Sequence, residues 1–318
     1  MDGAISWISD NNEIAYFDND ILVAKSEGIC NIAVMIQDKA ASAVVTVLGN
    51  KFEIKANVCK SDTDIDLNIT YTDEKKRELK LNGLKTTSKN FKTCVKTVLF
   101  STKDLLLLRG TPQDRRDWLD RAISQIYPAY DERLSKFDKI RVQKNNLLKE
   151  DVIDETLLDI YNEQLIITGS NIIYLRKKFL KEIEEFAKSK HKTISNTEDF
   201  DLSYTCPKNE IEEISEYLKE ELKTRKNEEI ARRQSCVGPH RDDIEFRINE
   251  IDAVKFASQG QQRTIVLALK LSELDIITDK TGDEPLLLLD DVLAELDDIR
   301  QNYLLKSIGP TTQTIITS

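Results

Sequence analysis

Histidine and paired cysteines are scarce in this sequence. It has two histidines, His191 and His240, and five cysteines, no two of which form a CxxC pair. An odd number of unpaired cysteines favours reduced thiols in a cytosol over a disulfide framework or a zinc site. Two histidines are too few for a histidine-based metal centre.

Long apolar runs and a secretion signal are also missing. The longest apolar runs, such as Leu105 to Leu108 and Leu286 to Leu289, are far too short to span a bilayer. The opening "MDGAISWISD" has neither a basic nor an apolar signal region. We therefore expect a cytoplasmic protein without membrane contact.

The composition is that of a folded, acidic protein. The chain has 318 residues, 40% of them hydrophobic and 32% charged, with a formal net charge of −10. That length allows two domains, or one large domain with an appendage. The acidic total argues against coating nucleic acid with the whole surface, but it leaves local basic faces possible.

Four zones follow one another along the chain. Residues 1–48 and 49–103 are rich in alternating, strand-like segments, and Asn82-Gly83 in the second zone predicts a tight hairpin. Residues 104–233 read as helical, and residues 234–318 mix strands with a long amphipathic helix. We expect these zones to correspond to domains or parts of domains.

The helical zone predicts an arm. Thr111 is a good cap, Pro112 suits the first helical position, and Asp114 suits the first turn. A coiled-coil-like seam follows, and a weaker return seam comes after residues 189–209, which we interpret as a loop or tip of a helical hairpin. The first seam is Leu158, Tyr161, Leu165, Thr168, Ile172, Leu175, Phe179, Ile183 and Phe186, and the second is Ile211, Ile214, Leu218, Leu222 and Arg225.

The polar stretch "FASQGQQRT", residues 256–264, stands directly before the apolar start of a helix. Ser258 and Gln261 have the spacing of a capping box, and Gly260 lets the backbone approach a ligand closely. A helix N-terminus of this kind suits a phosphate group. On this motif alone, an ordinary capped helix is the better interpretation.

The run "LLLLDDV", residues 286–292, predicts a parallel strand buried on both faces. Asp290 and Asp291 at its end are placed where α/β nucleotide enzymes hold Mg²⁺ and orient a water. Two neighbouring strand residues face opposite sides, so one carboxylate could face the metal and the other the water. A strand that runs into an acidic turn is an equally good interpretation.

Taken together, these motifs resemble the RecF family of DNA replication and repair proteins. The resemblance covers about residues 50–318 and is carried by "KLNGLK", "VLFSTKDLLLLRGTPQDRRDWLD", "GPHRDDIEF", "FASQGQQRTIVLALKLSEL", "LLLLDDVLAELDDIR" and "TQTIITS". It implies an α/β fold, namely an incomplete ABC-ATPase-like head with a helical arm and an additional N-terminal β segment.

The resemblance also implies roles for individual residues. Ser258, Gln259, Gly260, Gln261 and Gln262 match the ABC signature, which contacts ATP held by the other subunit. Asp290 matches the Walker B ligand of Mg²⁺ through ATP, and Asp291 takes the place of the residue that positions the water. Glu295, Leu296 and Asp297 match the D-loop, and Thr317 lies near the switch position. His240 in "GPHRDD" receives no chemical role, since a lone histidine is more often structural.

A P-loop is missing from the sequence. No GxxxxGK[ST] occurs, and "GLKTTS" at residues 83–88 lacks the upstream glycine. RecF proteins carry this loop near their N-terminus, before the region matched here. Without its lysine and backbone cradle the triphosphate has no primary seat. We therefore predict that this chain alone neither binds ATP tightly nor hydrolyses it.

Residues 1–48 instead resemble the later part of a bacterial immunoglobulin-like repeat. The residues on that pattern are Trp7, Ser9, Ile14, Ala15, Asp18, Ala24, Gly28 and Ile32. Three explanations stay open: a genuine fusion, a junction between two genes, or a chance likeness, which we rank last.

The function implied by the resemblance is an ATP-gated, DNA-binding clamp that dimerises head to tail. Such a protein works with RecO and RecR at gapped DNA or single-strand/double-strand junctions and loads the recombinase. Arg115, Arg116, Arg141 and Lys144 are candidates for phosphate contacts, although solvated helix faces are the better interpretation of each. A non-enzymatic scaffold built on a degenerate ATPase is the alternative, and an SMC-like ATPase ranks third because the arm is short.

Overall fold

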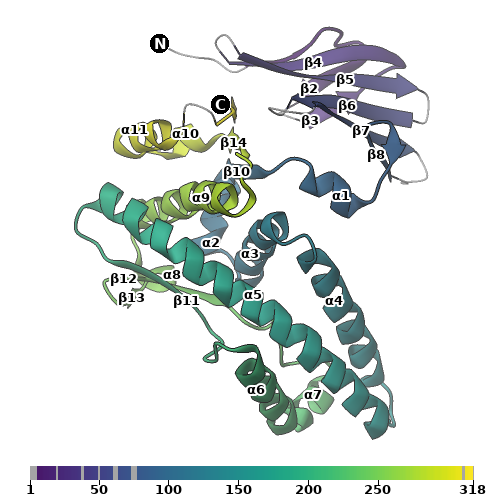
Figure 1. The fold of residues 1–318 in the computed structure, drawn as a ribbon, viewed down its shortest axis with the longest axis vertical. Coiled ribbons are helices and arrows are strands. Elements are labelled where there is room, and N and C mark those ends of the chain that lie inside the picture. The colour runs from purple at the N-terminus through teal and green to yellow at the C-terminus, as the bar shows by residue number, and fades with distance from the viewer. Residues whose placement is uncertain are drawn as a thin grey trace. The chain divides into compact units, whose positions relative to one another are not determined.

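The chain forms two compact units (Figure 1). The computed structural model describes residues 6–18, 21–36, 39–48, 51–59, 64–72, 77–309 and 312–317. The first unit holds Met1–Thr102, Asp283–Asp297 and Gly309–Ser318, and the second holds Lys103–Gly282 and Asp298–Ile308. The first unit is thus assembled from three separate stretches of the sequence.

The larger sheet of the first unit is antiparallel and has the strand order β1-β4-β5-β6-β7-β8-β9. A separate hairpin pairs β2 with β3. β5 and β6 pair from Ala43 with Ala56 to Leu48 with Lys51, so the sheet continues across the predicted boundary at residue 48. The strands are β1 (Ser6–Ser9), β2 (Ala15–Asp18), β3 (Ile21–Ala24), β4 (Gly28–Ile36), β5 (Lys39–Leu48), β6 (Lys51–Cys59), β7 (Asp64–Thr72), β8 (Arg77–Leu81) and β9 (Leu84–Lys85).

The predicted hairpin at Asn82-Gly83 is confirmed. The two residues join β8 to β9, with Leu81 paired to Leu84. Asn82 has φ 50° and Gly83 has φ 77°. Two positive φ values in a two-residue loop match the right-handed twist of the flanking strands, which explains why asparagine and glycine stand there. The helix α1 (Ser88–Thr93) follows.

A second sheet of the first unit is parallel and places the Asp290 strand at its centre. Its order is β10 (Thr97–Ser101), β14 (Leu286–Asp290) and β15 (Thr314–Thr317). Along β14, Leu287 and Leu289 are buried, whereas Leu286 and Leu288 are only half-buried. The parallel strand was therefore predicted correctly, but its burial on both faces was not.

The second unit is mainly helical and is built around α5 (Glu155–Ser195), a helix of 41 residues (Figure 1). The helix α3 (Pro112–Ile126) begins as predicted, with Thr111 as cap, Pro112 in the first turn and Asp114 accepting hydrogen bonds from Thr111. The elements in chain order are η1 (Thr102–Leu105), α2 (Leu106–Arg109), α3 (Pro112–Ile126), α4 (Tyr130–Leu147), α5 (Glu155–Ser195), β11 (Phe200–Tyr204), α6 (Ile211–Thr224), α7 (Lys226–Arg232), β12 (Ile244–Ile248), β13 (Ile251–Asp252), α8 (Ala253–Phe256), α9 (Gln259–Thr281) and α11 (Asp298–Ser307).

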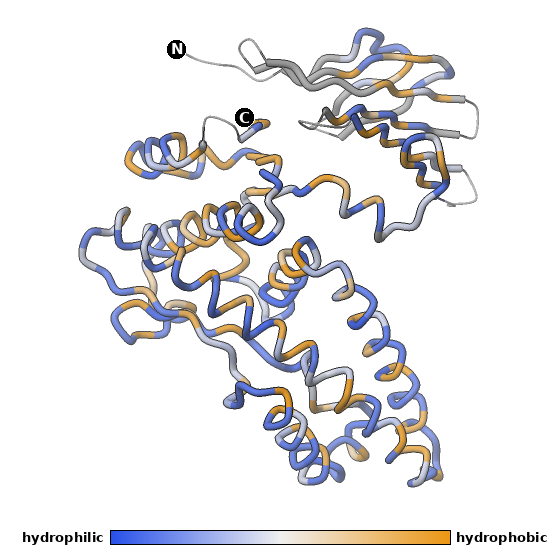
Figure 2. Tube along the Cα trace, viewed as in Figure 1, coloured by the Kyte–Doolittle hydropathy of each residue, from blue (hydrophilic) through white to orange (hydrophobic). Residues whose placement is uncertain are grey.

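The apolar seam predicted along α5 is largely buried. Six of its positions lie in the interior: Leu158, Leu165, Thr168, Ile172, Phe179 and Ile183. The return seam on α6 buries Ile214, Leu218 and Leu222. α9 is buried all round over Thr264–Leu274, as expected for a helix in the centre of a unit, and Figure 2 shows hydrophobic colour along part of it.

The interpretation of residues 189–209 as a loop or tip was wrong. α5 continues to Ser195, and the segment then forms β11, which pairs antiparallel with β12. Phe200, Leu202 and Tyr204 are buried and alternate with more exposed residues. This alternation with a period of two is the sequence signal of a strand, but turn-forming residues around it led us to interpret the segment as a loop. The predicted zone boundary at residue 233 therefore falls within one three-stranded sheet, β11-β12-β13.

Candidate nucleotide-binding site

The polar stretch at residues 256–264 forms the capped start of α9. Ser258 is the cap residue: its Oγ accepts a hydrogen bond from the backbone N–H of Gln261 at 3.2 Å. The side-chain Oε1 of Gln261 accepts in return from the N–H of Ser258 at 2.8 Å. Both bonds of the predicted capping box are thus present.

Three side chains from distant segments brace this turn. Glu198, between α5 and β11, accepts a hydrogen bond from Nε2 of Gln261 at 2.8 Å. Arg109 on α2 donates through Nε to Oε1 of Gln262 at 2.7 Å. Arg300 on α11 donates to the carbonyl of Gly260 at 2.9 Å and to Oγ1 of Thr264. The glutamines of the motif therefore fix its position within the second unit.

Gly260 lies close to Arg300. A Cβ atom built at Gly260 would lie 3.4 Å from a guanidinium nitrogen of Arg300, an ordinary contact, so a small side chain would fit there. The first backbone N–H groups of a helix have no carbonyl partner within the helix, so those of Gln259 and Gly260 remain for a ligand, as does the hydroxyl hydrogen of Ser258. These donors suit a phosphate oxygen.

The carboxylates predicted for the metal and the water lie in the first unit. Asp290 is the last residue of β14 and is half-buried. Oγ1 of Thr317, on the neighbouring strand β15, donates to its Oδ1 at 2.8 Å. The N–H of Asp291 in turn donates to Oγ1 of Thr317 at 3.3 Å. The residue expected near a switch position therefore contacts both members of the acidic pair.

Asp291 differs from the prediction in its backbone. It lies beyond the end of β14, with φ 53° and ψ 14°, and precedes the short helix α10 (Val292–Glu295). Strand alternation consequently does not apply to the pair, and the expectation that the two side chains face opposite sides of one strand was wrong. A non-glycine residue in the left-handed region is strained, and such strain often marks functional sites. Asp291 is exposed to solvent.

The D-loop candidates follow directly. Glu295 ends α10, Leu296 is its C-cap and is buried, and Asp297 leads toward α11. Within the described ranges, no group of three or more histidine, cysteine, aspartate or glutamate side chains could hold a metal ion by itself. A divalent ion bound through the phosphates of a nucleotide needs only one or two protein carboxylates, which Asp290 could supply.

Three of the four basic residues considered for DNA contact lie in the interior. Arg115 binds both carboxylate oxygens of Asp243, at 2.6 and 2.8 Å. Arg116 donates to the carbonyl of Asp242 at 2.6 Å. Lys144 is fully buried. Their burial disfavours contact with a nucleic acid, because each charge is already used inside the protein.

The buried basic residues pair with partners inside the protein, whereas Arg141 is only half-buried. Lys144 Nζ lies 2.6 Å from Oε2 of Glu229, which is 3% exposed. Arg141 is half-buried and pairs with Asp138 on its own helix at 3.0 Å. Only Arg141 stays a candidate for DNA contact.

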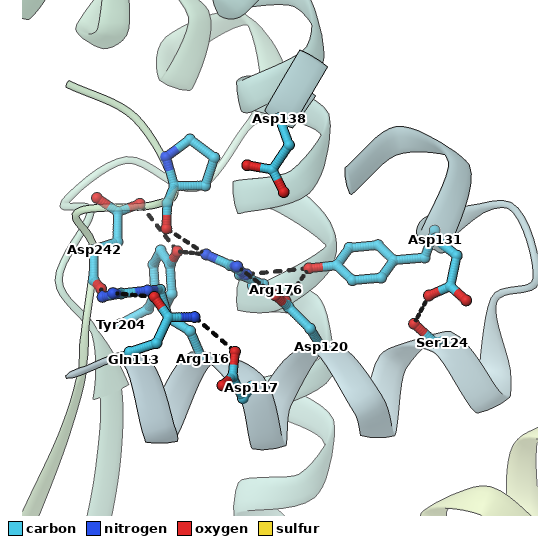
Figure 3. A network of polar contacts seen from close by, with 12 residues as sticks. Gln113, Arg116, Asp117, Asp120, Ser124, Asp131, Asp138, Arg176, Tyr204 and Asp242 are labelled. Carbon is cyan, nitrogen blue, oxygen red and sulfur yellow. Dashed lines mark hydrogen bonds and ion pairs between the residues drawn. The ribbon is translucent and has the colours of Figure 1, made fainter. Parts of the chain in front are cut away.

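A buried polar network that the sequence analysis missed is centred on Arg176 (Figure 3). Arg176 donates to both carboxylate oxygens of Asp120 at 2.8 Å, to the hydroxyl of Tyr204 at 3.0 Å and to the carbonyl of Pro239 at 2.6 Å. Tyr204 in turn donates to Asp242 at 3.0 Å. Arg176 stands four residues after Ile172 and three before Phe179, so a charge on the apolar face of α5 was the available signal.

This network explains the "GPHRDD" motif. Its residues Pro239, Asp242 and Asp243 receive hydrogen bonds from α3 and α5, so the motif ties these helices to the strand that follows. Burial raises the pKa of Asp242 to about 6, against the lowering effect of the bond from Tyr204. His240 packs against Phe137, and burial lowers its pKa to about 3. A neutral, packed imidazole supports the structural interpretation of His240.

Comparisons with known proteins bear on this architecture. No protein-family model matches the chain. The DNA replication and repair protein RecF of Thermosynechococcus vestitus is 41% identical over 276 residues, which cover 84% of this chain and 73% of that protein. RecF of Natranaerobius thermophilus is 40% identical over 287 residues, with 84% and 74% covered.

The chain belongs to the RecF family of DNA replication and repair proteins. A solved structure of the recombination mediator protein RecF-ATPrS in the RecFOR pathway superposes with a TM-score of 0.79 at 33% identity, covering 86% of this chain and 76% of that one. The structure of RecF-ATP in the same pathway gives 0.78 at 34% identity, covering 86% and 75%. The predicted RecF membership and α/β head architecture are confirmed.

None of the described helices combines the length and apolar character needed to cross a membrane. The roles of the signature, Walker B, D-loop and switch residues stay predictions.

Proposed function

We propose that this RecF-family chain is an ATP-dependent DNA-binding clamp that acts in recombinase loading at gapped DNA. The observation that supports it best is the braced turn Ser258–Gln262, in which three other segments hold a phosphate-type donor set in place. Such bracing is the preorganisation that a phosphate-sensing contact needs. In this proposal the turn contacts ATP in a head-to-tail homodimer, and the second copy of the chain holds that ATP only weakly, because the sequence has no P-loop.

The acidic pair and the capped turn fit ATP with Mg²⁺, whereas the seat for the triphosphate is missing from the sequence. When bound, ATP with Mg²⁺ supplies the charged γ-phosphate that links the two subunits. Asp290 would face the Mg²⁺, Asp291 would orient a water, and Thr317 holds both through its hydroxyl. Glu295, Leu296 and Asp297 would meet the second copy. The sequence has no GxxxxGK[ST], so the seat for the triphosphate is the part that does not fit.

The partners belong to the same proposal. The two solved relatives are RecF proteins of the RecFOR pathway. We infer from that relationship that this chain works with RecO and RecR at single-strand/double-strand junctions in the cytoplasm. Arg141 is the one basic candidate from the sequence analysis that we retain for DNA contact.

The missing P-loop also favours a second function, a non-enzymatic scaffold built on an ATPase fold. A scaffold has no need of phosphate donors, a strained acidic pair and a D-loop in one chain, so their joint presence disfavours this second function. The two functions differ in whether nucleotide changes DNA binding.

Fluorescence anisotropy on gapped duplex DNA tests the proposal. With ATP and Mg²⁺ we expect binding that weakens steeply as salt rises, since phosphate contacts release counterions. Ser258→Arg should abolish the nucleotide effect, because it blocks the first donors of α9. Absence of DNA binding at low salt, with or without nucleotide, would overturn the proposal. Binding that ignores nucleotide and Ser258→Arg would favour the scaffold.

A further inference from the structure

A groove on the second unit is lined by none of the residues of the braced turn. It has a volume of about 640 Å³ and is lined by α5, by β11 and by Asn209 and Glu210, which directly precede α6. Sites of this size hold peptide side chains or small ligands. Tyr174, Lys177, Lys178, Lys181 and Glu184 of α5 all line it, and their spacing of three and four places them on one helix face.

The floor of the groove is apolar. Leu180, Leu202 and Tyr204 line it and are 3%, 5% and 8% exposed. The hydroxyl of Tyr204 is already engaged with Arg176 and Asp242, so the ring presents apolar surface. A large apolar side chain entering here would lose contact with water, which stabilises binding.

The rim of the groove carries cations without carboxylate partners. Within the described part of the chain, Lys177, Lys178 and Lys181 form no ion pair. Nζ of Lys177 donates to the carbonyl of Cys206 at 2.5 Å, and Nζ of Lys178 lies 5.8 Å from the centre of the Tyr127 ring.

Lysines further along the same helix are paired. Lys188 lies 2.6 Å from Asp201, Lys190 2.7 Å from Asp275, and Lys192 3.3 Å from Asp199. Lys177, Lys178 and Lys181 differ from those lysines in that all three line one groove. They give the groove a positive rim that is complementary to an anionic partner.

We propose that this groove binds an acidic peptide segment of a partner protein, with a large apolar side chain on the floor and carboxylates on the lysine rim. A nucleic acid fits less well. Its phosphates gain nothing from an apolar floor, and Glu184 and Glu210 on the walls repel an evenly spaced row of phosphates. A peptide can place its carboxylates where the lysines are. This partner site is independent of the ATP-dependent function proposed above.

Binding of a fluorescein-labelled, aspartate-rich peptide that ends in phenylalanine tests the proposal. We expect saturable binding to the full chain that weakens about tenfold or more in Lys178→Glu/Lys181→Glu, because the charge complementarity is reversed. Both side chains are exposed, so the fold should be kept, which circular dichroism checks. Lys219→Glu/Lys223→Glu on α6 changes the net charge equally at exposed positions and should bind the peptide as the parent does.

The peptide itself supplies the remaining controls. Replacing its phenylalanine by serine, or its aspartates by asparagine, should each reduce binding. Peptide binding that is absent, or that is equal in the two double variants, overturns the proposal. If the peptide does not bind and single-stranded DNA binds with sensitivity to Lys178→Glu/Lys181→Glu, the groove is a nucleic-acid site and the proposal is wrong.

Discussion

The side-chain amide of Gln261 donates a hydrogen bond of 2.8 Å to the carboxylate of Glu198, although the two residues are 63 positions apart. The same amide group caps α9 through its oxygen. Glu198 follows the long helix α5, so the bond connects the end of that helix to the turn that matches the ABC signature.

Replacing Glu198 by alanine should loosen the first turn of α9. The lost hydrogen bond is worth about 1 kcal/mol, so we expect faster amide hydrogen exchange over residues 257–264 with little change in overall unfolding. Glu185→Ala, at an exposed position of α5, is the matched control. Equal exchange in the two variants would show that Glu198 does not brace the turn.

Removing Glu229 should be among the most destabilising single changes in the second unit. Its carboxylate receives Lys144 at 2.6 Å and the N–H of Cys236 at 2.8 Å, all in the interior. Glu229→Ala leaves a buried lysine without a counter-charge, which costs about 3–5 kcal/mol. Urea unfolding measures the loss.

A partly exposed ion pair at the adjacent position of the same helix, α7, supplies the control for that experiment. Glu228 pairs with Arg225 at 2.8 Å, and both side chains are about one-third exposed. Glu228→Gln should cost less than about 1 kcal/mol, as surface pairs do. Replacing Lys144 and Glu229 together by methionine and leucine should recover part of the lost stability, since the buried N–H of Cys236 still loses its acceptor. A small effect of Glu229→Ala contradicts the importance of the pair.

Asp242 should make the protein less stable as the pH rises from about 4 to about 6. Burial raises its pKa from 3.8 to about 6 in the folded state. The folded state thus binds the proton more tightly than the unfolded state, and the resulting stability is present at low pH and lost as pH rises through 6. The shift corresponds to at most about 3 kcal/mol.

Comparing Asp242→Asn with the parent isolates the contribution of Asp242 protonation to the free energy of unfolding. The difference in unfolding free energy between the two should move in favour of Asp242→Asn as pH rises across that window. Asp138→Asn changes an exposed carboxylate and should show no such drift. A pH-independent difference for Asp242→Asn would mean that Asp242 titrates normally.

The purified chain should show no robust ATP hydrolysis. A triphosphate without the P-loop lysine and backbone cradle lacks its main binding contacts, and the sequence contains no such loop. Phosphate release with and without Mg²⁺ tests this directly. Mg²⁺-dependent turnover that disappears in Asp290→Asn would refute it.

Local patterns were sufficient to predict many elements of the fold. Asn82-Gly83 fixed a hairpin, Thr111-Pro112 fixed a helix start, and Ser258 with Gln261 fixed the capping box, because each depends on neighbours within four residues. The RecF family was predicted from the resemblance of several ordered segments to RecF proteins.

Partners that are distant in sequence could not be predicted in this way. Arg115 and Lys144 looked available for phosphates, since nothing nearby in the sequence shows that Asp243 and Glu229 fold against them. The strand β11 has a local period-two signal, but the partner that completes its sheet, β12, begins forty residues after β11 ends and could not be predicted from nearby residues. The strained backbone of Asp291 likewise depends on contacts with β15.

The pairing of β5 with β6 gives residues 39–48 a protective role. If residues 1–48 were removed, the sheet would end at β6. The backbone N–H and C=O groups of β6 that now pair with β5 would then be free to pair with another extended chain. Exposed strand edges of this kind promote association between molecules. Whatever its origin, the N-terminal segment covers the edge of β6 in this protein. A chain shortened at residue 48 should therefore be more prone to associate through that exposed edge strand.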